Sequence, residues 1–227
     1  MSSSTRAITR LAIGLLIGLV GGIVTAAVTL IAMYGSLIKL MTQPGAPPNV
    51  NALMAVFNSL TIMIMIGVSI TVIAAVIQYL GFAELSSINS RYSTAKIGAL
   101  LIPVGSIIEV PGIYLFIDAM KELISTNQLN SAPTLGIMMQ PTTAALGMLI
   151  PSIILILVGG ILSFVGLILI VIGYYRLGED YGADIVRVGA ILYILAIIPY
   201  IGPFLSLAGI IMVIIGLFQI RQRPEKP

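Results

Sequence analysis

The run LAIGLLIGLVGGIVTAAVTLIAMYGSLI, residues 11–38, decides the fold of this chain. It contains no charged side chain and exceeds the roughly 20 residues that cross the hydrocarbon core of a bilayer as a helix. A secretory signal peptide has an apolar core of only about 7–15 residues, followed by a small-residue cleavage site. We therefore interpret the run as the first membrane span and not as a leader that is removed.

The composition of the whole chain agrees with this interpretation. Of its 227 residues, 59% are hydrophobic and 8% are charged, whereas a soluble globular domain carries about 25% charged residues. The apolar runs lack the alternation of polar and apolar residues found in membrane β-barrel strands. A helix in hydrocarbon satisfies its own backbone hydrogen bonds. The sequence therefore predicts an all-α, multi-pass integral protein of the cell membrane.

Apolar runs, and the Pro- and Gly-rich breakers between them, predict about six transmembrane helices in a single membrane domain, residues 1–227. The expected spans are residues 11–38, 53–80, 96–111, 143–175, 185–201 and 203–220. In residues 114–125, YLFIDAMKELIS, polar side chains recur at helical spacing. This pattern predicts an amphipathic helix on the outer surface.

The distribution of basic residues predicts the orientation. Cytoplasmic loops of membrane proteins carry an excess of Lys and Arg. With the N-terminus inside, nine basic residues fall in inner segments and two, Lys39 and Lys121, in outer ones. The inner nine are Arg6, Arg10, Arg91, Lys96, Arg176, Arg187, Arg221, Arg223 and Lys226. Both termini are therefore predicted to be cytoplasmic.

The chain contains an internal repeat. Residues 81–102, GFAELSSINSRYSTAKIGALLI, are similar to residues 173–194, GYYRLGEDYGADIVRVGAILYI. Each copy begins with a glycine and an aromatic residue at the end of one span and opens the next span with Gly-Ala. We expect two parallel helix-pair repeats, formed by spans two and three and by spans four and five.

Regularly spaced glycines predict a glycine-seamed bundle. A seven-residue interval keeps small residues along one seam of a left-handed helix pair, and a four-residue interval is the GxxxG type. The helix-packing candidates are Gly98, Gly105, Gly189, Gly202, Gly209 and Gly216 at seven-residue spacing, and Gly14, Gly18 and Gly22 at four-residue spacing. We expect them to pack within the chain. The alternative is that the Gly14–Gly22 face joins another membrane protein or a second copy.

The sequence offers little material for catalysis. It has no Cys and no His, which excludes thiol nucleophiles, disulfides and thiolate or imidazole metal sites. It has no phosphate-binding loop and no nucleophile-elbow motif. The basic tail, residues 221–227, is too short and mixed to indicate nucleic-acid binding. We therefore predict no catalytic residue, no metal site, no cofactor and no nucleic-acid partner.

Glu179, Asp180 and Asp184 form an acidic segment between the fourth and fifth spans. Paired carboxylates can hold Mg²⁺ for chemistry on lipid substrates. No second acidic cluster accompanies them, however, and Arg176 and Arg187 flank them. A solvated cytoplasmic loop is the preferred interpretation.

Three polar residues lie within or beside the spans. If the third span is continuous, Glu109 is an intramembrane carboxylate and so a functional candidate. The repeat instead aligns it with Tyr200 and puts a turn at Pro111–Gly112, which places Glu109 at the outer boundary. Asn58 and Gln78 are suited to hydrogen bonds between helices.

The second half of the chain combines four features: the span end in GYYRLGEDYG, the Gly-Ala span start, the turn in IPYIGPFL and the glycine-spaced last helix. With these features, residues 80–220 resemble an archaeal family of multi-pass membrane proteins known as domain of unknown function 973. The resemblance implies an archaeal source and about six spans. It implies no activity, cofactor or catalytic residue.

Three classes of function remain. A structural or accessory subunit of a membrane assembly is expected first, because the spans hold few polar groups. A small transporter or channel using Glu109 is the alternative. An enzyme of lipid substrates using the Glu179, Asp180 and Asp184 loop is third. The expected partners are the lipid bilayer and, through glycine-lined faces, other membrane proteins or a second copy.

Overall fold

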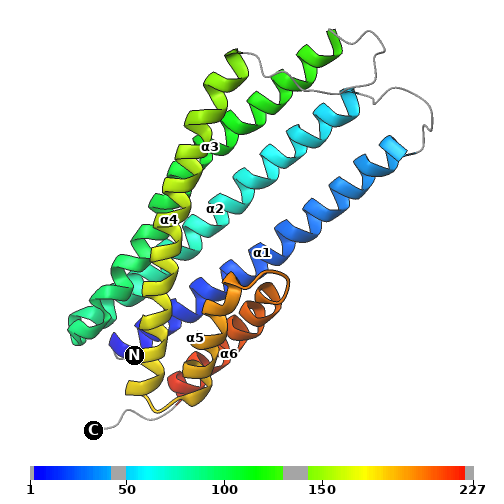
Figure 1. Ribbon diagram of the computed structural model, residues 1–227. Coiled ribbons are helices and arrows are strands. Elements are labelled where there is room, and N and C mark those ends of the chain that lie inside the picture. The colour runs from blue at the N-terminus through cyan, green and yellow to red at the C-terminus, as the bar shows by residue number, and fades with distance from the viewer. Residues whose placement is uncertain (1–2, 42–49, 130–142, 223–227) are drawn as a thin grey trace. The chain divides into compact units, whose positions relative to one another are not determined.

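The computed structural model describes residues 3–41, 50–129 and 143–222, which form helices joined by short turns (Figure 1). The elements are α1 (Ser3–Met41), α2 (Val50–Ile88), η1 (Ser90–Tyr92), α3 (Ser93–Leu129), α4 (Thr143–Asp180), α5 (Asp184–Ile194), η2 (Leu195–Ile197) and α6 (Gly202–Gln222). The all-α fold predicted from composition is confirmed. Residues 42–49, 130–142 and 223–227, which hold most of two expected loops and the basic tail, lie outside the described ranges.

Within these ranges, five helices are long and apolar enough to cross a membrane: α1, α2, α3, α4 and α6. The fifth expected span, residues 185–201, is not one of them. Its helix α5 has 11 residues, which rise about 16 Å, roughly half the thickness of the hydrocarbon core. The apolar run continues to residue 201, but the helix does not. The orientation of the termini stays a prediction.

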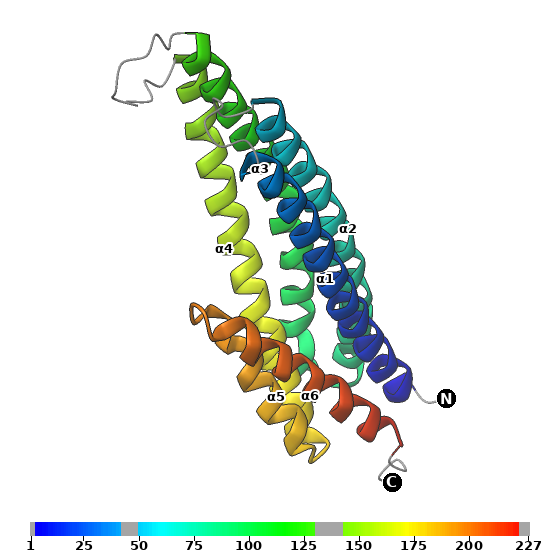
Figure 2. The ribbon, with the colours of Figure 1, turned by 90° about the vertical axis from the view of Figure 1, so that its right-hand side faces the viewer.

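The short connection after η2 explains why α5 ends early. Tyr200 has a φ of 66°, and the Ile201 amide donates a 2.8 Å hydrogen bond to the Pro199 carbonyl. A bond between residues two apart around a positive φ is a γ-turn, which reverses the chain sharply. α6 then runs back beside α5 (Figure 2).

The turn expected at Pro111–Gly112 is absent, because α3 runs unbroken from Ser93 to Leu129. Gly112 instead serves helix packing: a Cβ added there would lie 2.8 Å from the Leu155 Cβ and 2.9 Å from the Ser152 carbonyl of α4. Proline is tolerated inside membrane helices when neighbouring groups satisfy the freed carbonyls. Residues 114–125 therefore belong to α3, and their position on the membrane surface stays a prediction.

Contacts divide the chain into two compact units, although α1 to α4 each contribute to both. Unit 1 comprises Met1–Gly22, Ser69–Ser106 and Ile161–Pro227. Unit 2 comprises Ile23–Val68 and Ile107–Gly160. Unit 1 therefore contains both copies of the sequence repeat.

The core of unit 1 forms where the two repeat copies meet. Phe82 and Tyr174 follow the first glycine of each copy, and their rings pack at a centroid distance of 5.2 Å and an angle of 58°. Both side chains are fully buried. Around them lie buried aliphatic residues from α1, α2, α4, α5 and α6, including Leu11, Leu85, Leu177, Val186 and Leu217.

Glycine contacts in unit 1 repeat from one helix pair to the next. A Cβ on Gly98 of α3 would meet the Gly166 carbonyl, the Leu169 Cβ and the Ile170 amide of α4. A Cβ on Gly189 of α5 would meet the Gly209 carbonyl, the Met212 Cβ and the Val213 amide of α6. The offsets of zero, three and four residues are the same in both pairs. The α3–α4 crossing is thus reproduced by α5 and α6.

Unit 2 is packed mainly between α3 and α4. Its buried residues are Gly112, Ile117, Ala119, Leu123, Ala145, Ser152 and Gly159. The part of α1 in this unit contributes little, because none of residues 23–35 is buried. Thr25 does approach α2, its methyl group lying 3.5 Å from the position of a Cβ on Gly67.

Candidate functional site

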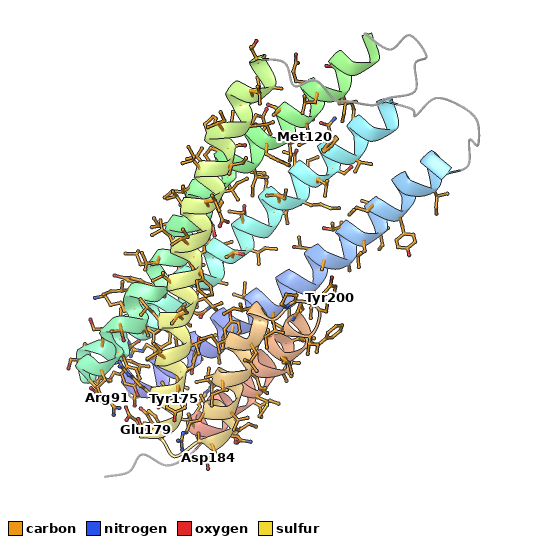
Figure 3. All side chains as sticks on the ribbon, in the orientation of Figure 1. Arg91, Met120, Tyr175, Glu179, Asp184 and Tyr200 are labelled. Carbon is orange, nitrogen blue, oxygen red and sulfur yellow. The ribbon has the colours of Figure 1, made fainter. Side chains whose placement is uncertain are left out.

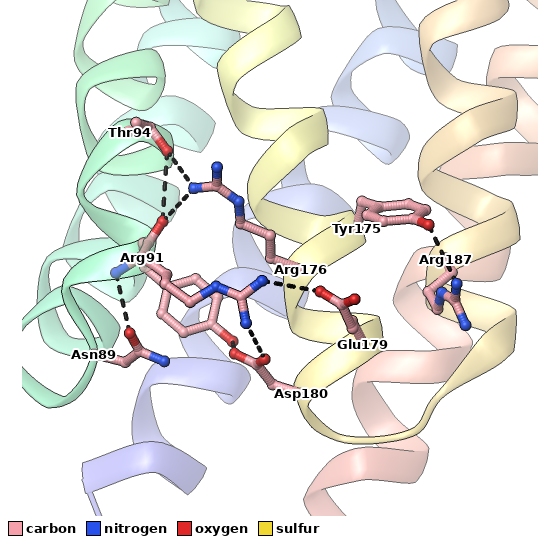
Figure 4. Close-up of polar contacts among 9 residues, drawn as sticks. Asn89, Arg91, Thr94, Tyr175, Arg176, Glu179, Asp180 and Arg187 are labelled. Atoms are coloured by element: carbon pink, nitrogen blue, oxygen red, sulfur yellow. Dashed lines mark hydrogen bonds and ion pairs between the residues drawn. The ribbon is translucent and has the colours of Figure 1, made fainter.

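The densest polar cluster among the described residues lies in unit 1, where η1, the end of α4 and the start of α5 meet (Figure 3). Arg91 of η1 joins the two repeat copies. Its Nη1 donates to Asp180 Oδ1 and its Nη2 to Glu179 Oε2, each at 3.0 Å (Figure 4). One guanidinium thus bridges two carboxylates that are adjacent in sequence.

Local structure fixes the position of Arg91. The Asn89 side chain caps η1 by accepting a 3.0 Å hydrogen bond from the Arg91 amide. The next residue, Tyr92, is buried, and its hydroxyl donates a 2.6 Å hydrogen bond to Asp180 Oδ2. Asp180 therefore has both oxygens bonded to the first repeat copy, whereas Glu179 is bonded to Arg91 through Oε2.

Arg176 lies one turn before Asp180 on α4. Its Nη1 donates to the Arg91 carbonyl at 2.6 Å and to Thr94 Oγ1 at 3.0 Å. Both acceptors are neutral. No carboxylate of the described residues lies within ion-pair distance of Arg176. The Arg176 side chain is thus held by hydrogen bonds to neutral groups and not by an ion pair within the described ranges.

Arg187 of α5 covers the other side of α4. It forms an ion pair with Asp184 at 3.1 Å, donates a 3.2 Å hydrogen bond to the Tyr175 hydroxyl and lies over that ring at 5.3 Å. The hydrogen bond to Tyr175, with a smaller contribution from Asp184, raises the pKa of the Arg187 guanidinium. This side chain therefore stays a cation across the physiological pH range.

A cavity of about 400 Å³ opens between α4 and α5 beside this cluster. Its apolar wall consists of Val171, Ile172, Ile191 and Ile194. Its polar mouth consists of Arg91, Tyr175, Arg176 and Glu179. The site combines apolar surface with guanidinium donors, an arrangement suited to binding and not to nucleophilic attack.

The whole described length of the chain matches one family model. Residues 4–227 match the model described as "Protein of unknown function (DUF973)". The chain belongs to this family. Its membership is thereby confirmed, over a longer range than the residues that carry the resemblance. No curated protein and no solved structure is detectably similar to this DUF973 member.

The three acidic residues of the loop do not form a metal site in this DUF973 protein. Glu179 and Asp180 bind Arg91, whereas Asp184 turns to Arg187 and has a side chain 85% exposed. In the described ranges no three His, Cys, Asp or Glu residues are grouped so that they could hold a metal ion. The acids serve as ion-pair partners.

The three polar candidates of the spans are divided between the two units. Gln78 is buried in unit 1 and accepts a 2.9 Å hydrogen bond from the Tyr174 hydroxyl. In unit 2, Asn58 is exposed. Glu109 is half-buried inside α3, about 24 Å along the helix from Ser93. Its Oε1 lies 3.4 Å from the position of a Cβ on Gly160.

The glycine candidates pack in different ways. Gly14 and Gly18 face Ala74 of α2, with a Cβ on Gly14 only 2.8 Å from Gln78 Cγ. A Cβ on Gly22 would meet nothing within 4 Å. The four-residue stripe of α1 is therefore used inside the chain at its start and is open at its end.

Sequence reasoning did not single out Arg91, Tyr92, Thr94 or the cavity. The available signal was the difference in charge between the two similar turns: residues 87–92 carry Arg91 and no acid, whereas residues 179–184 carry three acids. Opposite charges in two similar turns indicate contact between the copies. The sequence gives no measure of the cavity, because its walls are ordinary span residues.

Proposed function

We propose that this protein is a structural or accessory subunit of a membrane assembly, without a catalytic role of its own. The observation that carries the proposal is the open surface of α1 in unit 2. None of residues 23–35 is buried, and Val24, Ile31 and Tyr34 are 54%, 74% and 68% exposed. A span that buries so little against its own chain leaves most of its surface open to a neighbour.

The chemistry of this surface fits another membrane helix. Lipid tails are as apolar as valine and isoleucine, so association in a bilayer is driven by close packing. Gly22 and Ala26 are four residues apart and both exposed, and Gly22 has no neighbour within 4 Å of an added Cβ. Small residues at this spacing let a second backbone approach closely.

The absence of Cys makes the proposal directly testable. Single variants Gly22→Cys and Ile31→Cys, extracted in nanodiscs from native membranes, are treated with a bifunctional thiol–amine cross-linker and analysed by mass spectrometry. We expect one membrane protein, or a second copy, to be captured in high yield. Ile150→Cys on α4, 61% exposed, is the matched control for random lipid-phase collisions. Equal capture from both helices, or a lone monomer throughout, would contradict the proposal.

Glu109 favours a second candidate, a small transporter or channel. Its carboxylate has no ion pair or hydrogen bond to any described residue, and a carboxylate within an apolar span is costly unless it serves a function. Proteoliposome flux assays with a panel of monovalent ions test this role. Flux that is lost in Glu109→Gln would displace the accessory role. The enzyme alternative rests on loop acids that are already ion-paired with Arg91 and Arg187.

A further inference from the structure

The cavity beside α4 has two chemically distinct parts. Four aliphatic side chains from α4 and α5 form its wall, and two guanidinium groups, a carboxylate and a phenol surround its mouth. Its volume of about 400 Å³ lies within the range of small-molecule binding sites, roughly 300–1,000 Å³. An amphiphile matches such a site better than a fully polar or fully apolar ligand does.

The charges around the mouth select the sign of the ligand. Arg91 is paired with Glu179 and Asp180, and Arg187 is paired with Asp184. Asp180 does not line the cavity, and its second oxygen is bonded to Tyr92. Within the described ranges, the hydrogen bonds of Arg176 go to neutral acceptors and are made by a single nitrogen of its guanidinium. The remaining donors of Arg176 are therefore not committed to an ion pair with any carboxylate of the described residues.

The position of the site within the chain specifies the kind of amphiphile. Charged side chains of membrane proteins gather at the level of the lipid head groups, and this cluster stands at the end of the apolar helix α4. Arginine binds phosphate through a planar fork of donors, and basic pockets between helices are suited to acidic head groups.

We propose that this cavity binds an anionic membrane phospholipid, with its phosphate at Arg176 and the first part of one chain along Val171, Ile172, Ile191 and Ile194. Glu179, held by Arg91, faces the head group from the same mouth and is available to accept a hydrogen bond from a head-group hydroxyl. The proposal is independent of the accessory role, because it concerns the isolated chain.

The test uses the purified, delipidated full-length protein in detergent. Binding of phosphatidylglycerol and of phosphatidylcholine with identical chains is measured by native mass spectrometry and by the shift in thermal unfolding. Wild type is expected to prefer phosphatidylglycerol, and Arg176→Gln to reduce that affinity by about tenfold to a hundredfold through loss of a charged hydrogen bond. Arg221→Gln, which removes one exposed positive charge away from the cavity, is expected to retain the preference.

A second variant tests the apolar wall without changing any charge. Ile191 is 50% exposed, so Ile191→Trp is expected to fold while filling the cavity and reducing phosphatidylglycerol binding. Equal binding of the two lipids by wild type, or equal loss in Arg221→Gln and Arg176→Gln, would overturn the proposal. Stabilisation by inorganic phosphate alone that matches the lipid and persists in Ile191→Trp would also overturn it, in favour of a free-phosphate site.

Discussion

Gly98 of α3 and Gly166 of α4 face each other so closely that a Cβ on either would lie within 2.8 Å of the carbonyl oxygen of the other. Real Cβ atoms do not approach a backbone oxygen to this distance. The crossing can therefore form only when both positions lack a side chain. Gly189 and Gly209 stand in the same relation between α5 and α6.

Gly98→Ala is expected to destabilise the protein by about 1–3 kcal/mol, because the obstructing atoms belong to backbone and cannot rotate away. Gly22→Ala is the matched control, since its added methyl group meets nothing within 4 Å. There the higher helix propensity of alanine is expected to leave stability unchanged or raise it by up to about 1 kcal/mol. Thermal unfolding in one detergent compares the two variants, and equal effects would contradict the role of the crossing.

The buried hydrogen bond between Tyr174 and Gln78 gives a second prediction. Tyr174→Phe removes the donor and leaves Gln78 Oε1 without a partner in the core of unit 1. Such an orphaned buried group costs about 1–3 kcal/mol. Tyr200→Phe, at a position 91% exposed, is expected to have almost no effect on unfolding.

A double variant distinguishes the lost hydrogen bond from altered packing. Tyr174→Phe combined with Gln78→Met removes both polar partners and keeps similar side-chain volumes. We expect the double variant to recover part of the stability that Tyr174→Phe loses, since coupled residues show non-additive effects. Strict additivity would mean that the hydrogen bond contributes nothing.

The helices and the glycine seams could be predicted from the sequence because both depend on local pattern. Apolar runs identify membrane helices at any position. Glycine spacing shows on which face of a helix a neighbouring helix can approach closely. The pair Pro111–Gly112 shows the limit of this reasoning. The same two residues favour a turn in water and are tolerated within a packed membrane helix. The presence of Ser152 and Leu155 opposite Gly112 decides between these outcomes. The sequence around Pro111 and Gly112 does not show that these two residues of α4 lie there.

The two acids bound by Arg91 are expected to differ in importance. Asp180 also accepts the Tyr92 hydrogen bond, and Tyr92 is buried. Asp180→Ala is therefore expected to cost about 1–3 kcal/mol by leaving the Tyr92 hydroxyl without its acceptor. Glu179→Ala breaks an ion pair in which both side chains are 50% exposed, and is expected to cost less than about 1 kcal/mol. Denaturant unfolding of both variants at low and high salt measures the difference; a larger effect for Glu179→Ala would contradict the assignment.

The length of α5 predicts how the α5–α6 hairpin meets the bilayer. Between Val186, which faces Gly216, and the turn at Tyr200 the chain rises about 18–20 Å, less than the roughly 30 Å of the hydrocarbon core. We expect the hairpin to enter and return on one side. Ser90→Cys and Gln222→Cys should then react with an impermeant maleimide from the same face of sealed vesicles. Tyr200→Cys should be protected from both faces, and its labelling from the opposite face would mean that α5 crosses.

The candidate site was harder to foresee than the fold. Arg91 and Glu179 are 88 residues apart in sequence, and nothing local to either residue indicates the other. The acidic segment could be recognised in the sequence because five charged residues stand close together there. The cation that binds it, Arg91, lies in the other copy of the repeat, which has fewer charges. Hydropathy reasoning also misjudged residues 185–201, since it counts apolar residues and does not register where Tyr200 reverses the chain.

The unlike charges of the two similar turns affect which repeat copies pair with each other as the chain folds. Two segments with nearly the same glycine and aromatic frame could pair with the wrong copy, either within one chain or between neighbouring chains during synthesis. Joining two α4 ends would bring four carboxylates together, and joining two η1 turns would bring two guanidinium groups together. Only the pairing of unlike copies brings opposite charges together. The charges that first suggest an active site thus favour the pairing of each repeat copy with its counterpart over pairing with an identical copy.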